Sequence, residues 1–170
     1  MSEPEAGPGP EATRGPETVP EPEAVPGADP GPRPGRIRQG DRDKAYRPLP
    51  VERRRSAFEE GLDAYARRDY FAAHEALEPA WMGAADLSER ALHQGLIKVA
   101  AAGVHSVRHN PTGVVKNLQG ARRHLELARP MAGSWEVDVS ALIAVIDARL
   151  LDPGTAALGP APIIRRTAHP

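Results

Sequence analysis

Residues 69–81 read Asp69-Tyr70-Phe71-Ala72-Ala73-His74-Glu75-Ala76-Leu77-Glu78-Pro79-Ala80-Trp81. This order predicts a helix, because Asp69 stands where an N-cap belongs and apolar side chains recur behind it at helical spacing. At about 100° of rotation per residue, His74 and Glu78 fall in the middle of the apolar face. An unpaired buried polar group costs about 1 to 3 kcal/mol, so both side chains need partners. The stretch therefore predicts a buried His/Glu polar cluster, with Glu75 at its edge.

Four further helices are predicted around this one from hydrophobic periodicity and cap residues. They cover residues 51–67, 89–109, 112–128 and 139–150, and the helix of the quoted stretch covers 70–82. The expected N-caps of the last three are Ser88, Asn110 and Asp138. Residues 99–104 in the helix over 89–109 are small or apolar on all sides, so this helix should be central, with neighbours on both faces. The predicted fold class is all-α, a compact bundle of about five helices.

The two ends of the chain differ from this helical domain in composition. The chain has nineteen prolines, most of which precede residue 51. Residues 1–50 lack hydrophobic periodicity and predict a long disordered Pro/Gly/Glu-rich tail that ends in a basic linker. The helical domain then covers residues 51–152. Residues 153–170 form a C-terminal tail, of which residues 161–164 could dock over the bundle as an extended strand.

Composition limits the functions that the chain could have. It contains no cysteine, which excludes disulfides, thiolate catalysis and zinc sites with cysteine ligands. No leader pattern and no apolar run of about 18 residues is present, so we expect a cytoplasmic protein that binds no membrane. A net charge of -1 argues against nucleic acid as a partner. The acidic residues 1–31 and the basic residues 32–55 nevertheless keep one alternative open, contact with nucleic acid or protein through the basic linker.

Some of these residues belong to a longer pattern. It reads Phe58-x-x-Gly61-x-x-x-Tyr65, Asp69-Tyr70-Phe71-x-x-His74-Glu75-x-Leu77-Glu78-x-x-Trp81, Gln94-Gly95-Leu96-Ile97, then His105 and Asn110-x-x-Gly113. The combination resembles the DUF309 family, a domain of unknown function with an all-helical bundle fold, and covers about residues 55–128. The family's description as predicted metal-dependent hydrolases implies a metal-assisted reaction. The family commonly has Gln where this chain has Lys98.

Our first interpretation of the polar cluster is a structural role, or the binding of a ligand or partner. His74 and Glu78 would join Gln94 and His105 in a hydrogen-bonded network that fixes the packing of two helices. Other residues that would support the cluster are Tyr70, Trp81 and Asn110. The identity of a ligand, the existence of a homo-oligomer and the pathway are not readable from the sequence.

The alternative is a metal-dependent hydrolase. His74 and Glu78 are four residues apart, the spacing at which two helical side chains can hold one divalent cation such as zinc or manganese, and His105 would be the third ligand. Glu75 follows the histidine as the general base does in H-E-x-x-H metalloproteases, so it would activate a metal-bound water. Convergence of these side chains on one point is the geometric test. The histidines outside the cluster are expected to be exposed or terminal, and the charged residues of the first helix to face solvent; they are His93, His109, His124 and His169, and Arg53, Arg54, Glu59 and Glu60.

Overall fold

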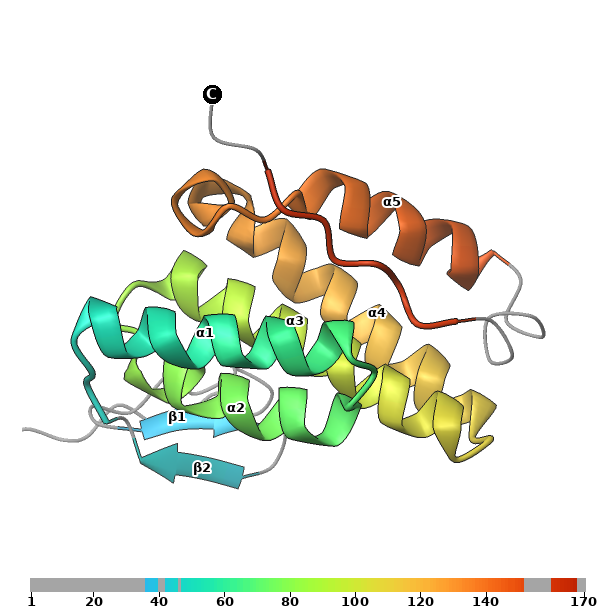
Figure 1. Cartoon of the computed structure of the whole chain (residues 1–170), viewed down its shortest axis with the longest axis horizontal. Coiled ribbons are helices and arrows are strands. Elements are labelled where there is room, and N and C mark those ends of the chain that lie inside the picture. Colours follow the sequence, from blue (N-terminus) through green and yellow to red (C-terminus); the bar gives the residue numbers. More distant parts are fainter. Residues whose placement is uncertain (1–35, 40–41, 46, 152–159, 168–170) are drawn as a thin grey trace, which may run out of the picture. The chain divides into compact units, whose positions relative to one another are not determined.

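The computed structural model describes residues 36–39, 42–45, 47–151 and 160–167. Five α-helices follow one another along the chain (Figure 1), namely α1 (Val51–Ala66), α2 (Tyr70–Gly83), α3 (Leu87–Val107), α4 (Pro111–Ala128) and α5 (Val139–Leu150). Two short 3-10 turns, Arg129–Met131 and Gly133–Trp135, join α4 to α5. The predicted all-α bundle is confirmed. None of these helices in the described part of the chain is long and apolar enough to cross a membrane.

A two-stranded antiparallel hairpin precedes α1 in the chain. It consists of β1 (Arg36–Gln39) and β2 (Arg42–Ala45), with Arg36 opposite Ala45 and Gln39 opposite Arg42. No strand was predicted here, because these residues show no clear alternation of apolar and polar side chains. The remainder of the predicted disordered tail up to Tyr46 lies outside the described residues.

The residues just before α1 are tied to the end of α2. The backbone amides of Arg47 and Leu49 donate to the carbonyls of Met82 and Gly83, both at 3.2 Å. A Cβ atom on Gly83 would lie 2.7 Å from the Cβ of Leu49, so this close approach requires glycine. The folded part of the chain therefore includes residues that the sequence analysis assigned to the tail.

Side-chain caps begin four of the helices. Asp69, Asp86, Asn110 and Asp138 each accept a hydrogen bond from the backbone amide three residues later, at 2.8–3.1 Å. The prediction of Ser88 as the cap of α3 was wrong. Asp86 caps this helix instead, and its carboxylate also interacts favourably with the positive end of the helix dipole. As a result α3 begins two residues earlier than predicted, at Leu87.

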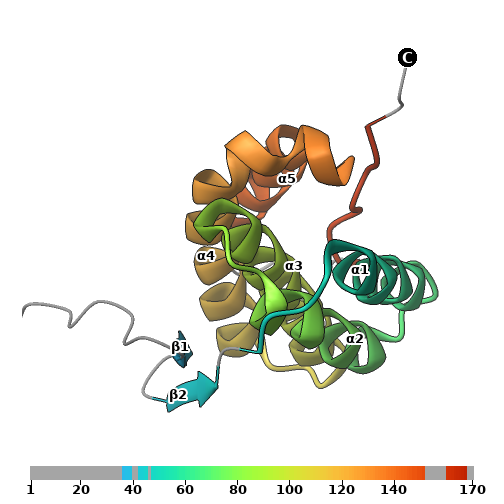
Figure 2. The ribbon, with the colours of Figure 1, turned by 90° about the vertical axis from the view of Figure 1, so that its left-hand side faces the viewer.

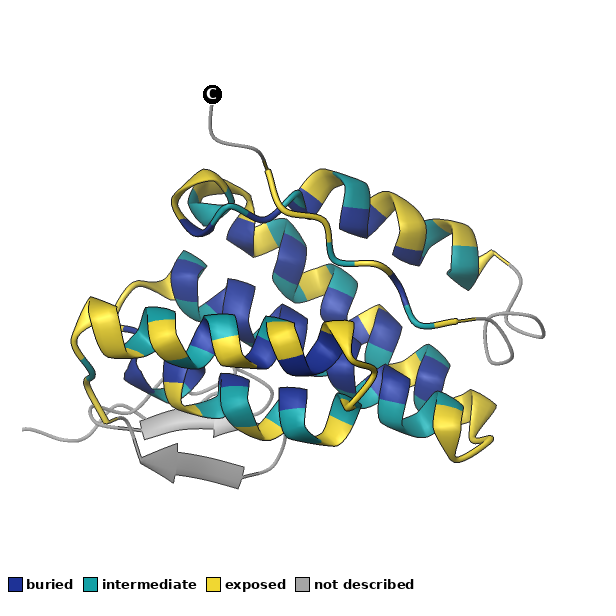
Figure 3. Cartoon of the chain, in the orientation of Figure 1, coloured by how far each residue is buried: buried dark blue, intermediate teal, exposed yellow. Residues whose placement is uncertain are grey.

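The central element is α3, as the sequence predicted. It is the longest helix, with 21 residues, and packs against α2 on one side and α4 on the other. Helix α1 pairs with α2, and α5 with α4 (Figure 2). The buried residues line the facing sides of the helices (Figure 3). Since α3 has neighbours on several sides, polar residues away from its main apolar stripe are buried as well.

Residues 160–167 cross the bundle between α1 and α5 in an extended conformation (Figures 1 and 2). The hydroxyl of Tyr65 on α1 donates to the carbonyl of Pro162 at 2.7 Å, and the guanidinium of Arg166 binds the carboxylate of Glu59 at 2.7 Å. The docking segment named from the sequence, residues 161–164, lies within this stretch. Glu59 was predicted to face solvent; it is partly exposed, and it also binds the C-terminal segment through Arg166.

Candidate functional site

His74 and Glu75 form a pair at the surface of α2. Nδ1 of His74 lies 3.1 Å from Oε1 of Glu75, and the two side chains are 26% and 57% exposed. Their helix presents its buried residues Ala73, Leu77 and Trp81 to the core instead. His74 is therefore partly exposed and not buried, contrary to the prediction.

The other predicted ligands do not join this pair. His105 is half-buried near the end of α3, with Nδ1 3.1 Å from Nδ2 of Asn110, and Glu78 is half-buried on α2. Within the described ranges, no group of three or more His, Asp or Glu side chains could hold a metal ion. The structure thus does not bring His74, Glu78 and His105 together as a ligand set. The metal site stays a prediction, without a matching geometry.

The supporting residues named from the sequence belong to different surroundings. Trp81 is fully buried in the core, and Gln94 is half-buried on α3. Tyr70 packs its ring edge-on against Tyr65, with the ring centroids 5.2 Å apart. Asn110 caps α4 in addition to contacting His105. These residues support the packing of the bundle at separate places.

A buried polar cluster exists, but α1 and α3 build it. The carboxylate of Glu89 accepts from Nε of Arg54 at 2.6 Å and from Nη2 at 3.1 Å. One turn further along α3, His93 is 0% exposed, and its Nε2 lies 3.5 Å from Oε1 of Glu89, longer than an ordinary hydrogen bond. The rings of Phe58 and Trp135 pack edge-on against His93, at centroid distances of 5.8 and 4.5 Å. The expectations that His93 is exposed and that Arg54 faces solvent were wrong.

The charges in this cluster balance one another. Burial raises the pKa of Glu89, but the hydrogen-bonded guanidinium of Arg54 and the nearby imidazole of His93 outweigh burial and hold the pKa below its ordinary value. Burial also lowers the pKa of His93, because it disfavours the charged imidazolium, and Glu89 opposes this shift only in part. At neutral pH the cluster is therefore an ion pair beside a neutral histidine. The ion pair joins α1 to α3, while both ring nitrogens of His93 are buried without a hydrogen-bond partner among the described residues.

The sequence contained a signal for this cluster. Glu89 and His93 are four residues apart, the same separation as His74 and Glu78. Both lie on the helix whose residues 99–104 are small or apolar all round, and a helix of that kind has neighbours on more than one side. A histidine in the middle of this central helix, such as His93, was therefore a better candidate for burial than His74.

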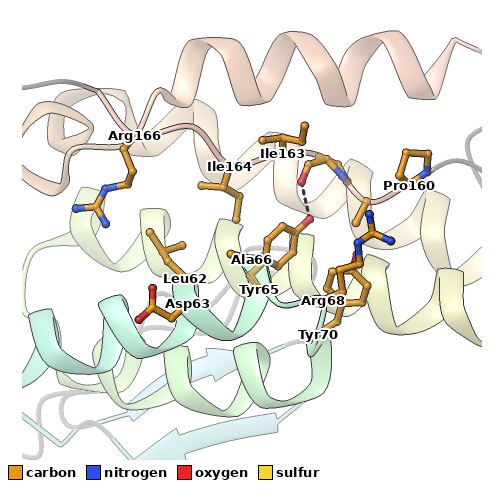
Figure 4. Close-up of a pocket in the computed structure, with 12 residues that line it drawn as sticks. Leu62, Asp63, Tyr65, Ala66, Arg68, Tyr70, Pro160, Ile163, Ile164 and Arg166 are labelled. Carbon is orange, nitrogen blue, oxygen red and sulfur yellow. Dashed lines mark hydrogen bonds between the residues drawn. The ribbon is translucent and has the colours of Figure 1, made fainter.

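A cleft of about 590 Å³ lies between the end of α1 and the C-terminal segment (Figure 4). Its walls are mainly apolar; Leu62, Tyr65 and Ala66 contribute from α1, and Ala161 and Ile164 from the segment. The volume lies within the range of about 300 to 1,000 Å³ that is usual for sites of small ligands. The cleft is formed by parts of the chain that are far apart in sequence, so no local pattern predicted it.

Three charged side chains line this cleft, Arg68 at one end and Asp63 and Arg166 toward the other. The Arg166 guanidinium is paired with Glu59 and Glu136. The guanidinium of Arg68 lies beside Pro160, and the carboxylate of Asp63 lies at the other end, near Leu62 (Figure 4). Within the described part of the chain, no hydrogen bond or ion pair holds the Arg68 side chain. Its backbone is left-handed, with φ 65, at the turn between α1 and α2, where glycine is the usual residue. The fold thus places a cation at the rim of an apolar cleft.

Comparison with known families identifies the central part of the chain. Residues 58–117 match the sequence model of the family described as "Domain of unknown function (DUF309)". This part of the chain is thus similar to DUF309 domains. No curated protein and no solved structure matched the chain. The matched residues contain all of α2 and α3 and end within α4. They include the His74–Glu75 pair and the buried Glu89–His93 pair, while α5 and residues 160–167 follow them.

Proposed function

We propose that this protein is a ligand-binding module whose cleft takes a small amphipathic organic anion, that is, a carboxylate carried on a hydrocarbon body. The observation that carries the proposal is the cleft of about 590 Å³ with apolar walls and a guanidinium at one end. Small-molecule sites typically combine an apolar lining with a few polar groups that fix the ligand's orientation. The buried cluster on α1 and α3 has its charges paired internally, so it does not compete as a binding site.

Arg68 would bind the anionic group. A guanidinium presents donors in a planar fork that matches both oxygens of a carboxylate, and such charge-assisted bonds are about twice as strong as neutral ones. The backbone at Arg68 is left-handed, a conformation that costs a residue other than glycine about 1 kcal/mol. Residues in this conformation are found at ligand sites and also at helix ends, as at His109 and Glu136.

The hydrocarbon body of the ligand would lie along the apolar walls. Leu62 and Ala66 form one wall and Ile164 the other. The C-terminal segment is held in place by the hydroxyl of Tyr65, whose pKa is raised by burial, so this hydroxyl stays a donor to Pro162 at all ordinary pH values. The wall that the segment contributes is therefore anchored without a ligand.

Calorimetric titration of the full chain with octanoate tests the proposal. Octanoate has the charge and the body that the cleft fits, acetate lacks the body, and octylamine has the opposite charge. We expect saturable binding of octanoate, and at least about tenfold weaker binding of acetate and octylamine. Equal binding of octanoate and acetate would refute the role of the apolar walls, and equal binding of octylamine would refute that of Arg68.

The variant Arg68→Gly separates binding from folding. It removes the guanidinium and relieves the left-handed backbone, so the free energy of unfolding should stay the same or rise by up to about 1 kcal/mol while octanoate binding falls at least about tenfold. Ala66→Phe should also abolish binding, because the ring would fill the cleft. Arg67→Gln is the matched control, since Arg67 is an exposed neighbour that does not line the cleft. A loss of binding as large in this control as in Arg68→Gly would contradict the proposal.

A further inference from the structure

A second feature of the surface lies on α3 and α4, away from the cleft. Lys116, Arg123 and His124 share one face of α4 with Gly120, because they follow one another at helical spacings of about one turn. Lys98 of α3 reaches across this face, since a Cβ atom on Gly120 would lie 2.8 Å from its Cδ and 3.3 Å from its Nζ. The ammonium group of Lys98 thus lies between Lys116, one turn before Gly120, and Arg123, one turn after it.

No carboxylate balances these cations in the described part of the chain. Burial lowers the pKa of Lys98, and Arg123 and Lys116 lower it further. Burial likewise lowers the pKa of His124 to about 4, and its other causes are Lys98 and Arg123. This differs from Arg122, the neighbour in sequence, whose guanidinium donates to the carboxylate of Asp147.

We propose that Lys98, Lys116 and Arg123 form an anion site that takes the phosphate group of a small organic phosphate. Lys116 and Arg123 act on the half-buried Lys98, so the three cations repel one another, and a bound anion removes that repulsion. A phosphate monoester carries about 1.5 to 2 negative charges near neutral pH and offers three acceptor oxygens, so it neutralises more of the site than a carboxylate does.

The size of the site favours a small phosphate over a nucleic acid. Proteins that grip duplex DNA typically neutralise about 6 to 10 phosphates, spread along a groove. This site offers the cations of Lys98, Lys116 and Arg123, all within two turns of α4 and the adjoining part of α3. Gly120 is the structural feature that makes the site compact, because any larger residue would displace Lys98 from the surface of α4.

Titration at constant ionic strength tests this proposal. Glycerol 3-phosphate and inorganic phosphate are the probes, with chloride as the control anion, and the full chain is followed by calorimetry and by thermal melting. We expect saturable binding of glycerol 3-phosphate. If inorganic phosphate binds as tightly as glycerol 3-phosphate, the site is still a phosphate site, and its ligand is free phosphate. Absence of binding by both, or binding of a DNA duplex that neither phosphate displaces, would overturn the proposal.

Two substitutions connect the binding to the site. Lys98→Met keeps the aliphatic stem and removes the charge, so phosphate binding should fall at least about tenfold while the ligand-free protein melts at the same temperature or higher. Arg123→Gln should weaken binding in the same direction. The control is Arg53→Gln, an exposed cation on α1. Phosphate binding that survives Lys98→Met, or that falls equally in the Arg53 variant, would refute the assignment.

Discussion

Replacement of Arg54 by methionine should destabilise the fold by about 3 kcal/mol, because it leaves the carboxylate of Glu89 buried without its cation. The side chains of Arg54 and Glu89 are only 14% and 6% exposed, and two hydrogen bonds of 2.6 and 3.1 Å join them. Removal of one partner from a buried ion pair costs about 3 to 5 kcal/mol in other proteins. The lower end applies here, since Nε2 of His93 lies 3.5 Å from the same carboxylate and can take up a proton to replace part of the lost charge.

Removal of both partners should cost much less. Apolar replacement of an entire buried ion pair is often close to neutral. Arg54→Met with Glu89→Leu should therefore cost about 1 kcal/mol, most of it from the further hydrogen bond that Arg54 donates to the carbonyl of Leu49. The coupling energy of the double-mutant cycle is then at least about 2 kcal/mol.

Urea unfolding followed by far-UV circular dichroism measures these free energies, and the dependence on pH gives an independent check. In Arg54→Met the destabilisation should shrink as the pH falls below about 6.5, because His93 gains its proton more easily next to an unpaired Glu89. A cost below about 1 kcal/mol for the single variant, or additive effects in the cycle, would show that the pair does not hold α1 to α3 in the way described.

Two further predictions concern single residues. The pKa of His124 is lowered from 6.5 to about 4, so as the pH falls the unfolded chain takes up a proton before the folded protein does. The free energy of unfolding should therefore drop by about 1 to 2 kcal/mol between pH 6.5 and pH 4. Urea midpoints of the wild type and of His124→Asn across this pH range check the prediction. Gly103→Ala would place a Cβ atom 2.5 Å from the ring of Tyr70 and should cost about 1 to 3 kcal/mol, whereas Gly133→Ala, with nothing within 4 Å, should be neutral or slightly stabilising in thermal melting.

The helices were predictable because each has its own local signal. Apolar residues recur at helical spacing, and Asp69, Asn110 and Asp138 stand at the N-caps where the structure has them. The start of α3 was less certain from sequence, since Asp86 and Ser88 are both ordinary cap residues and only the hydrogen bond from Glu89 to Asp86 decides between them. Local chemistry thus determines that a helix forms, and leaves its first turn ambiguous when two caps are close together.

The positions of the sites were not predictable in the same way, because they depend on which helix faces touch. The cleft requires that Tyr65 meet Pro162, 97 residues later in the chain. The buried cluster requires Arg54 to reach Glu89 across 35 residues. A helical wheel of residues 69–81 could show that His74 shares a face with apolar residues, but not that the core would take the neighbouring face of the helix.

The polar residues of α3 show how the structure distinguishes support from binding. Glu89 is fully buried and its charge is matched within the protein by Arg54, so this pair is complete without any other molecule. Lys98, nine residues later on the same helix, is half-buried, and the charged neighbours that act on it are cations. The Arg54–Glu89 pair stabilises the fold, whereas the repulsion between Lys98 and its neighbouring cations destabilises it unless an anion binds there. Arg68 at the cleft also has no partner for its side chain in the described part of the chain, so Arg68 and Lys98 are better candidates for binding an anion than the buried histidine.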